Sequence, residues 1–145
     1  MKRIIGIGIF TLCVLLNACE IHEYDNGDLQ GFWHLESIDT LHSGGKNDLS
    51  QKRLYWTFES KLLELQDKDH HATDLFFLQE HDGDSLYLSK PFTTDNLHDD
   101  SYVTDSTVFL PYGITTSQEH FSIVSCHDDR LILRSSSLQL NLRKW

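Results

Sequence analysis

The side chains best suited to metal binding lie close together between positions 67 and 74. The potential ligands there are Asp67, Asp69, His70, His71 and Asp74. Zinc needs nitrogen or sulfur ligands that converge tetrahedrally from a fixed scaffold, whereas neighbouring histidines in a polar loop have no common direction. The acids between Asp95 and Asp105 also lack the regular oxygen spacing of a calcium loop. We therefore expect no metal site, and no cofactor, in this chain.

A second group of reactive side chains is the run Cys126-His127-Asp128, which has the residue types of a nucleophile, a base and an orienting acid. Catalytic partners meet in space, but neighbours along a strand point to opposite faces of the sheet. The chain also has no Gly-x-Ser-x-Gly elbow and no phosphate-binding glycine loop. The sequence thus predicts a protein that is not an enzyme, with Cys126 as a small, half-buried hydrophobic residue.

The amino-terminal residues favour export and lipid attachment. Lys2 and Arg3 precede an apolar stretch, residues 4–16, that is too short for a stable membrane span. The sequence that follows resembles the lipobox of bacterial lipoproteins and reads Leu16-Asn17-Ala18-Cys19. The resemblance implies that residues 1–18 are a signal peptide and that the Cys19 thiol takes a diacylglycerol, with a further acyl chain such as palmitate on the new amino terminus. The alternatives are an ordinary signal peptide and a short membrane-buried helix.

Charge limits the partners of the chain. It has 12 basic and 22 acidic residues and a net charge of −10, and loss of Lys2 and Arg3 with the leader would leave −12. Nucleic acids and anionic lipid surfaces are bound by basic faces, so we expect no nucleic acid partner, and contact with the membrane only through the lipid on Cys19. Because Cys126 would then be the one remaining free thiol, the mature chain has no intramolecular disulfide.

The rest of the chain predicts one domain made of short strands. Residues 19–28 are acidic and poor in apolar side chains, which favours a solvated tether. From Leu29 to Trp145, alternating apolar runs are broken by turn residues about every ten positions. Val108 to Ile114 contains Pro111 and Gly113, which favours a bent connection or a helical turn. The expected strands are residues 32–38, 53–59, 62–66, 75–78, 85–90, 120–126, 130–134 and 138–144.

Eight strands with mostly short links favour an all-β fold, a small up-and-down antiparallel barrel. Strict alternation places five aromatic side chains inside it, and Tyr87 on the opposite face as a candidate rim residue. Together they are the candidates for an apolar ligand pocket at one barrel end: Trp33, Trp56, Phe58, Phe77, Tyr87 and Phe121. The strands are short, so a filled or nearly filled interior is favoured over an open cavity.

Several motifs of this domain resemble a known family. Gly31-Phe32-Trp33 matches the Gly-x-Trp signature of lipocalins, in which the tryptophan closes one barrel end under an arginine of the last strand. Arg143 is the candidate arginine, although alternation puts it on the face opposite Leu142. More specifically, the domain is similar to lipocalin-like lipoproteins of Bacteroides-type Gram-negative bacteria, a family of unknown function, over residues 53–58, 83–86, 111–114 and 140–145. The resemblance implies a lipocalin-like fold and a location, and no reaction.

The leading functional hypothesis is a lipid-anchored, non-enzymatic domain of the cell envelope. It would bind a small apolar ligand in the barrel mouth, or an envelope protein through its loops. Glu20 is not the Asp that commonly retains lipoproteins in the inner membrane, so the resemblance implies the outer membrane and leaves its face open. The alternatives are an enzyme or enzyme inhibitor that acts on envelope or host substrates, and a structural subunit of an outer-membrane complex.

Overall fold

The structure is a computed structural model of the chain, and it describes residues 26–93 and 102–145. The predicted lipid-bearing Cys19 and most of the acids between Asp95 and Asp105 lie outside the described residues. Within those two ranges, no helix is long and apolar enough to cross a membrane.

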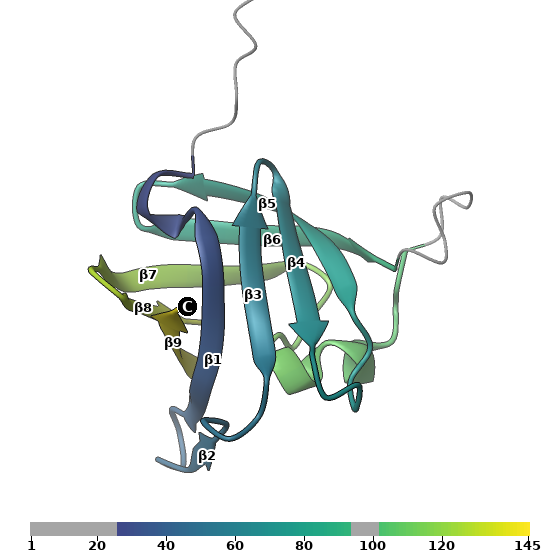
Figure 1. Ribbon diagram of the computed structural model, residues 1–145, viewed down its shortest axis with the longest axis horizontal. Helices are drawn as coiled ribbons and strands as arrows, with labels where there is room; N and C mark the ends of the chain where they lie inside the picture. Colours follow the sequence, from purple (N-terminus) through teal and green to yellow (C-terminus); the bar gives the residue numbers. More distant parts are fainter. Residues whose placement is uncertain (1–25, 94–101) are drawn as a thin grey trace, which may run out of the picture.

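The described part of the chain consists of antiparallel strands and short 3-10 turns (Figure 1). The strands are β1 Gly31–Thr40, β2 Lys46–Asp48, β3 Leu54–Glu59, β4 Leu62–Asp67, β5 Leu75–Asp82, β6 Ser85–Phe92, β7 Glu119–His127, β8 Arg130–Arg134 and β9 Leu138–Lys144. The turns are η1 Gly27–Leu29, η3 Ser106–Val108 and η4 Leu110–Tyr112. The helical turn expected between residues 108 and 114 is therefore present, as η4.

The sheet closes on itself because β1 pairs with both β3 and β9. From β3 to β9, each strand pairs with the next one in the chain. The β1–β9 ladder runs from Trp33 opposite Lys144 to Thr40 opposite Leu138. These pairings confirm the predicted up-and-down barrel of eight antiparallel strands. Closure also removes the unpaired edges that an open sheet would expose.

Several elements differ from the sequence prediction, and among them β1 runs on to Thr40 and β5 to Asp82. The prediction missed β2, whose three side chains are all exposed and therefore give no alternation. β6 continues to Phe92 instead of ending before Pro91, because Lys90 adopts a φ of 52° and a bulge accommodates the proline. Of the predicted tether, the structure describes Asn26, which is buried, and Gly27 and Asp28, which are exposed, and residues 19–25 lie outside the described residues.

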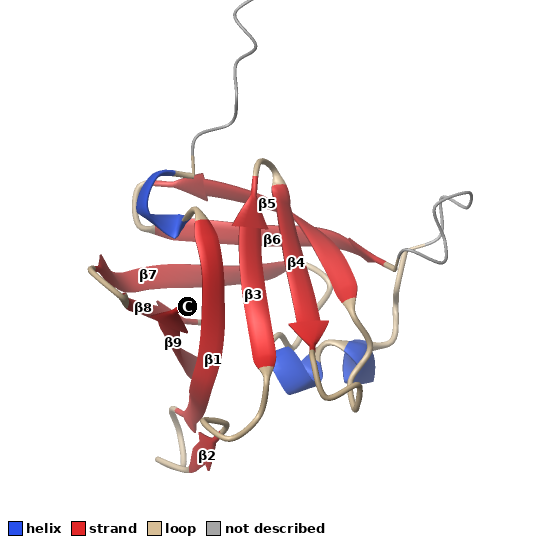
Figure 2. Cartoon of the chain, viewed as in Figure 1, coloured by secondary structure: helices blue, strands red, loops and turns tan. Residues whose placement is uncertain are grey.

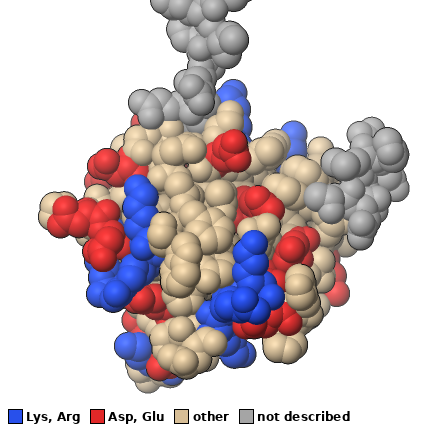
Figure 3. Space-filling model, viewed as in Figure 1, with Lys and Arg blue, Asp and Glu red and all other residues tan. Residues whose placement is uncertain are grey.

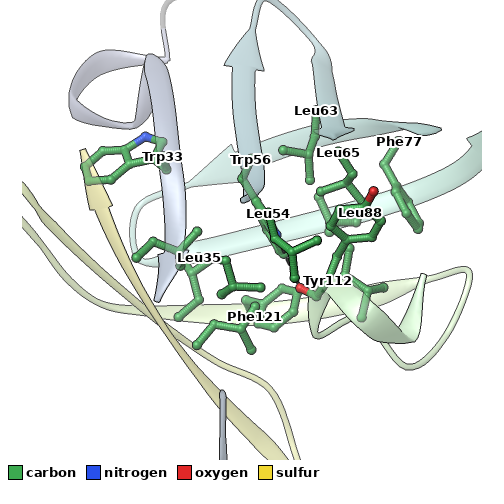
Figure 4. Close-up of a cluster of buried hydrophobic side chains, with 14 of the residues drawn as sticks. Trp33, Leu35, Leu54, Trp56, Leu63, Leu65, Phe77, Leu88, Tyr112 and Phe121 are labelled. Atoms are coloured by element: carbon green, nitrogen blue, oxygen red, sulfur yellow. Dashed lines mark hydrogen bonds between the residues drawn. The ribbon is translucent and has the colours of Figure 1, made fainter. Parts of the chain in front are cut away.

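Alternate side chains of the strands fill the barrel interior. Figure 4 labels ten residues of this cluster, which come from the strands except for Tyr112 of η4. Bulges at Glu36 and Val124 shift the alternation by one residue, so that Ile38 and Cys126 turn toward the core. Because each large apolar side chain contributes about 1.5–3 kcal/mol when fully buried, this core stabilises the domain without a disulfide.

One barrel end is closed by Trp33, as the resemblance implies, but the covering cation is not the expected one. The Trp33 indole N–H donates to the Leu29 carbonyl at 2.9 Å, which joins the first strand to η1. The Lys144 ammonium lies 5.4 Å from the Trp33 ring centroid. Arg143 instead pairs with the Glu36 carboxylate at 2.9 Å. The assignment of Arg143 is therefore wrong, because alternation turns it outward and turns Lys144 inward.

The opposite end is closed by η3 and η4 (Figure 2). Phe109, Tyr112 and Ile114 of this segment have no exposed surface. The Trp56 indole N–H donates to the Tyr112 carbonyl at 3.2 Å, and the Tyr112 hydroxyl donates to the Thr73 carbonyl at 3.0 Å. Burial, and to a lesser extent nearby carboxylates, raises the pKa of Tyr112, so its hydroxyl remains a donor. This segment is thus part of the core and not a loose loop.

A substitution at Gly113 can test how closely the segment of η3 and η4 packs against the barrel. Its φ is +84°, and a Cβ there would lie 2.9 Å from the Leu140 side chain. We expect Gly113→Ala to lower the free energy of unfolding by about 2–4 kcal/mol, from backbone strain together with crowding. The matched control is Gly44→Ala, where φ is +69° but nothing lies within 4 Å, so only the strain of about 1–2 kcal/mol applies. Urea unfolding measures both, and equal losses would show that the segment is not packed against Leu140.

Candidate functional site

The structure places the predicted pocket residues in two different environments. Trp33, Trp56, Phe58, Phe77 and Phe121 have no exposed surface. Their rings pack on one another and on the closing segment, with centroids 5.8 Å apart between Trp56 and Phe121 and 5.5 Å apart between Phe77 and Phe109. An eight-stranded barrel is only wide enough to be filled by side chains or to hold one small ligand, and here side chains take up this volume. That these residues bind a ligand stays a prediction.

Tyr87 does not face the interior. Its side chain lies on the outer face of β6 and stacks on His120 of β7, with ring centroids 4.8 Å apart. The strand register places these two residues opposite each other. Alternation predicted the outward direction, but the position is in the middle of a strand pair and not at the barrel mouth.

A cleft of about 410 Å³ lies on the outside of the barrel, beside the first strands. Phe32 and His34 come from β1 and Tyr55 from β3, on the outward-facing positions of these paired strands. Trp145 follows β9, and the segment 50–53 before β3 and Lys68 after β4 complete the wall. The volume falls in the range of small-molecule sites.

Four aromatic rings form the floor and one side of this cleft. Phe32 and Tyr55 stack with ring centroids 4.6 Å apart. The Trp145 ring meets Tyr55 and His34 edge-on, at 5.7 and 5.9 Å. Tyr55 and His34 are only 5% and 8% exposed although they face outward, whereas Trp145 is 75% exposed. We call Phe32, His34, Tyr55 and Trp145 the outer aromatic cluster.

Hydrogen bonds hold this cluster in place. The Trp145 backbone N–H donates to the Phe32 carbonyl at 2.9 Å, which extends the β1–β9 pairing by one residue. The His34 Nε2 atom lies 2.7 Å from the Lys52 carbonyl. A carbonyl can only accept a hydrogen bond, so the Nε2 atom of His34 carries the proton of this bond. The His34 ring and the Lys52 backbone are therefore fixed together.

Basic side chains line the cleft beside the aromatic rings. Figure 3 shows this face, where an uncharged strip over β1 and β3 is flanked by both basic and acidic groups. The Arg53 guanidinium donates to the Asp69 carboxylate at 2.7 Å and to the Lys68 carbonyl at 3.1 Å. The hydrogen bonds from Arg53 lower the pKa of Asp69. Among the residues that the structure describes, Lys52 and Lys68 form no ion pair with an acid, although the positive charge of Lys68 partly offsets the burial that raises the pKa of Glu64.

The loop after β4, residues 67–74, which contains the acids weighed above as metal ligands, has a structural role. The Asp67 carboxylate accepts backbone N–H bonds from Asp69, His71 and Ala72, at 2.7–2.8 Å. Burial alone would raise the pKa of Asp67, but these three bonds lower it overall. In the described ranges, no three potential ligands converge on a metal position. The carboxylate thus shapes the loop that presents Lys68 and Asp69.

The side chains of Cys126, His127 and Asp128 do not converge on one site. Cys126 lies opposite Leu131 and packs against the core. His127, the last residue of β7, and Asp128 of the following turn are exposed, and their side chains approach each other at 3.2 Å. Burial, and then the negative charge of Asp28, raises the pKa of the Cys126 thiol, which makes it a weaker nucleophile at neutral pH.

Sequence reasoning missed the outer aromatic cluster as a site. Alternation does turn Phe32, His34 and Tyr55 outward on neighbouring strands, and three aromatic residues on an outer face are a signal. Trp145 joins them only through the register between β1 and β9, which no local pattern specifies.

Comparison with known proteins agrees with this architecture. A family model described as a lipocalin-like domain matches residues 13–145. Two solved structures are similar: a lipocalin-like protein from Bacteroides uniformis, with a TM-score of 0.62 and 16% identity over 82% of this chain and 100% of that one, and an uncharacterized protein from Bacteroides eggerthii, with a TM-score of 0.59 and 14% identity over 81% and 99%. These identities support the fold alone. No curated protein matches the chain.

The role of Asp67 can be tested through pH. Asp67→Asn is expected to lower the free energy of unfolding at pH 7 by about 1–3 kcal/mol, because buried N–H groups lose their charged acceptor. The folded-state pKa of Asp67 is lowered, so its contribution is complete above an unfolded pKa of about 3.9 and is lost as pH falls through the folded value. Urea unfolding should therefore show a smaller difference between wild type and variant at acidic pH.

Asp82→Asn is the control for this series, because Asp82 is exposed at the end of β5. Its unfolding free energy should follow that of the wild type. A difference between the Asp67 variant and wild type that does not shrink with falling pH would contradict a charge-dependent role.

Proposed function

Because the chain belongs to the lipocalin-like domain family, we propose that it is a lipid-anchored, non-enzymatic binding domain of the cell envelope, most simply on the outer membrane. We further propose that it holds a small ligand in the outer cleft and not inside the barrel. The single observation that carries the second proposal is the position of the aromatic side chains. The interior rings are fully buried against one another, whereas Trp145 stands open beside a cleft of about 410 Å³.

The preformed shape of the cleft supports a binding role. Tyr55 and His34 are buried beneath Trp145 and Phe32, so the floor is fixed before any ligand arrives. Fixed walls reduce the ordering cost of binding. An aromatic side chain also offers a large contact area with few rotatable bonds. These properties favour a small molecule that lies against the open face of Trp145.

The surroundings of Cys126 support a non-enzymatic function. Its thiol packs against the core with a raised pKa, and the neighbouring His127 side chain is exposed. A nucleophile needs a base within hydrogen-bond reach and a lowered pKa, and Cys126 has neither of these from its neighbours in sequence. The enzyme alternative therefore has less support than the binding role.

The amino-terminal sequence supports the lipid anchor. Cys19 stands seven positions before Asn26, the first described residue, whose side chain is already buried in the domain. Seven residues can span at most about 25 Å, so an anchored domain would stay close to the lipid headgroups. The outer cleft would then act on molecules near the membrane.

The anchor can be tested by metabolic labelling of the full chain in a Gram-negative host with an alkyne analogue of palmitate. We expect the label on the wild-type protein and its loss in Cys19→Ala, because acyl transfer requires the modified cysteine. Cys126→Ala is the control and should remain labelled. Label that persists in the Cys19 variant, or an unlabelled wild type, would contradict lipid anchoring at this residue.

The cleft can be tested with N-phenyl-1-naphthylamine, an uncharged ring compound whose fluorescence rises in apolar surroundings. Trp145→Ala should weaken its binding about tenfold, because one aromatic contact and its apolar area are lost. Tyr87→Ala removes an exposed ring from another outer face and should leave binding unchanged. Equal affinity of wild type and the Trp145 variant would place the probe elsewhere and overturn the assignment of the cleft.

A further inference from the structure

We propose that the ligand of the outer cleft is a small ring compound that carries an anionic group, such as a carboxylate, sulfonate or phosphate. This inference rests on the proposed function of the cleft and specifies the chemistry of its ligand. The observations that point to it are the exposed Trp145 ring and, in the same lining, Lys52 and Lys68, which form no ion pair within the described residues.

The charge of the cleft is opposite to that of the chain. The whole chain carries a net charge of −10. The lining nevertheless contains Lys52, Arg53 and Lys68, and no aspartate or glutamate. Basic residues are fewer than acidic ones in this sequence. Their gathering around one cleft therefore creates a local positive potential that attracts anions, although the chain as a whole is negatively charged.

The three cations are not equivalent. Arg53 is held by Asp69 at 2.7 Å, which offsets much of its charge and fixes its position in the wall. In the part of the chain that is described, Lys52 and Lys68 have no such acid. The two lysines are therefore the donors that remain for a ligand.

The backbones of both lysines are fixed although their ammonium groups are not paired. The Lys52 N–H donates to the Leu49 carbonyl at 2.9 Å, and the Lys52 carbonyl accepts from His34. The Lys68 N–H donates to the Arg53 carbonyl at 2.9 Å, and its own carbonyl accepts from the Arg53 guanidinium. Two hydrogen bonds thus position each lysine stem at the edge of the cleft.

The aromatic side selects the remainder of the ligand. The Trp145 ring lies roughly perpendicular to the Tyr55 and His34 rings, and Trp145 is 75% exposed. A flat ring can stack on this surface while its anionic substituent reaches a lysine. A cationic ring would be repelled by Lys52 and Lys68, and an uncharged one would cover these ammonium groups without pairing them.

The test compares two probes that differ mainly in charge: 8-anilino-1-naphthalenesulfonate, which is anionic, and N-phenyl-1-naphthylamine, which is not. We expect the wild-type protein to bind the sulfonate about tenfold more tightly. In the double variant Lys52→Gln/Lys68→Gln this preference should disappear, whereas Lys46→Gln, on exposed β2, should keep it. Raising the salt concentration to about 1 M, where the screening length is about 3 Å, should weaken binding of the sulfonate alone.

The outcomes separate this inference from the proposed function. Equal affinity for both probes, with binding still lost in Trp145→Ala, would overturn the anion preference and leave the cleft as a binding site. A sulfonate preference that survives in the double lysine variant would likewise overturn the role of Lys52 and Lys68. Failure of both probes to bind the wild type would overturn the proposed cleft function together with this inference.

Discussion

The register between β1 and β9 is the constraint on which the rest of the structure depends. Because Trp33 lies opposite Lys144, the sheet closes with the lysine over the indole ring at one barrel end. The same register brings the next residue, Trp145, beside Phe32 on the outer face. One set of backbone pairings therefore seals the core and also builds the outer aromatic cluster. A shift by one residue would reverse both, because neighbouring side chains point to opposite faces.

The filling of the interior has a direct consequence for function. Members of this architecture can use the barrel volume for a ligand, but here Trp56, Phe58, Phe77 and Phe121 have no exposed surface. The segment around Tyr112 adds further rings and backbone hydrogen bonds at one end. A barrel packed in this way gains stability and rigidity, and its recognition surfaces must then lie outside. The proposed outer cleft, with Phe32 of β1, Tyr55 of β3 and the nearby Lys52 and Lys68, lies there.

Much of the fold could be predicted from the sequence, because successive side chains of a strand point alternately inward and outward and so leave a period of two in the apolar residues. Trp33, Trp56 and Phe121 were placed inside by alternation alone, and turn residues such as Asp82-Gly83 marked the links between strands. Bulges were not predictable, since a single extra residue such as Glu36 or Val124 leaves no local trace. The short strand β2 was missed for a related reason, because it is exposed throughout.

The candidate site was harder to predict, because its parts are distant in sequence. Phe32 and Tyr55 are outward on β1 and β3, and Trp145 follows β9, so only the pairing of these strands brings the three residues together. Lys68 reaches the same cleft through a loop that the Asp67 carboxylate shapes. Asp67, which lies among the acids weighed as metal ligands, thus supports a loop, and that loop places the basic Lys68 at the cleft.

Asn26 has a mechanical consequence for the point at which the chain enters the barrel. Its side-chain amide donates to the Ser60 carbonyl at 3.0 Å and accepts from the Gln79 amide at 2.6 Å, so it is fastened to both the β3–β4 turn and β5. A pull on the preceding residues would be shared between these two attachments before it reached Trp33 and the first strand. The load would meet several hydrogen bonds at once instead of peeling β1 from its neighbours one bond at a time.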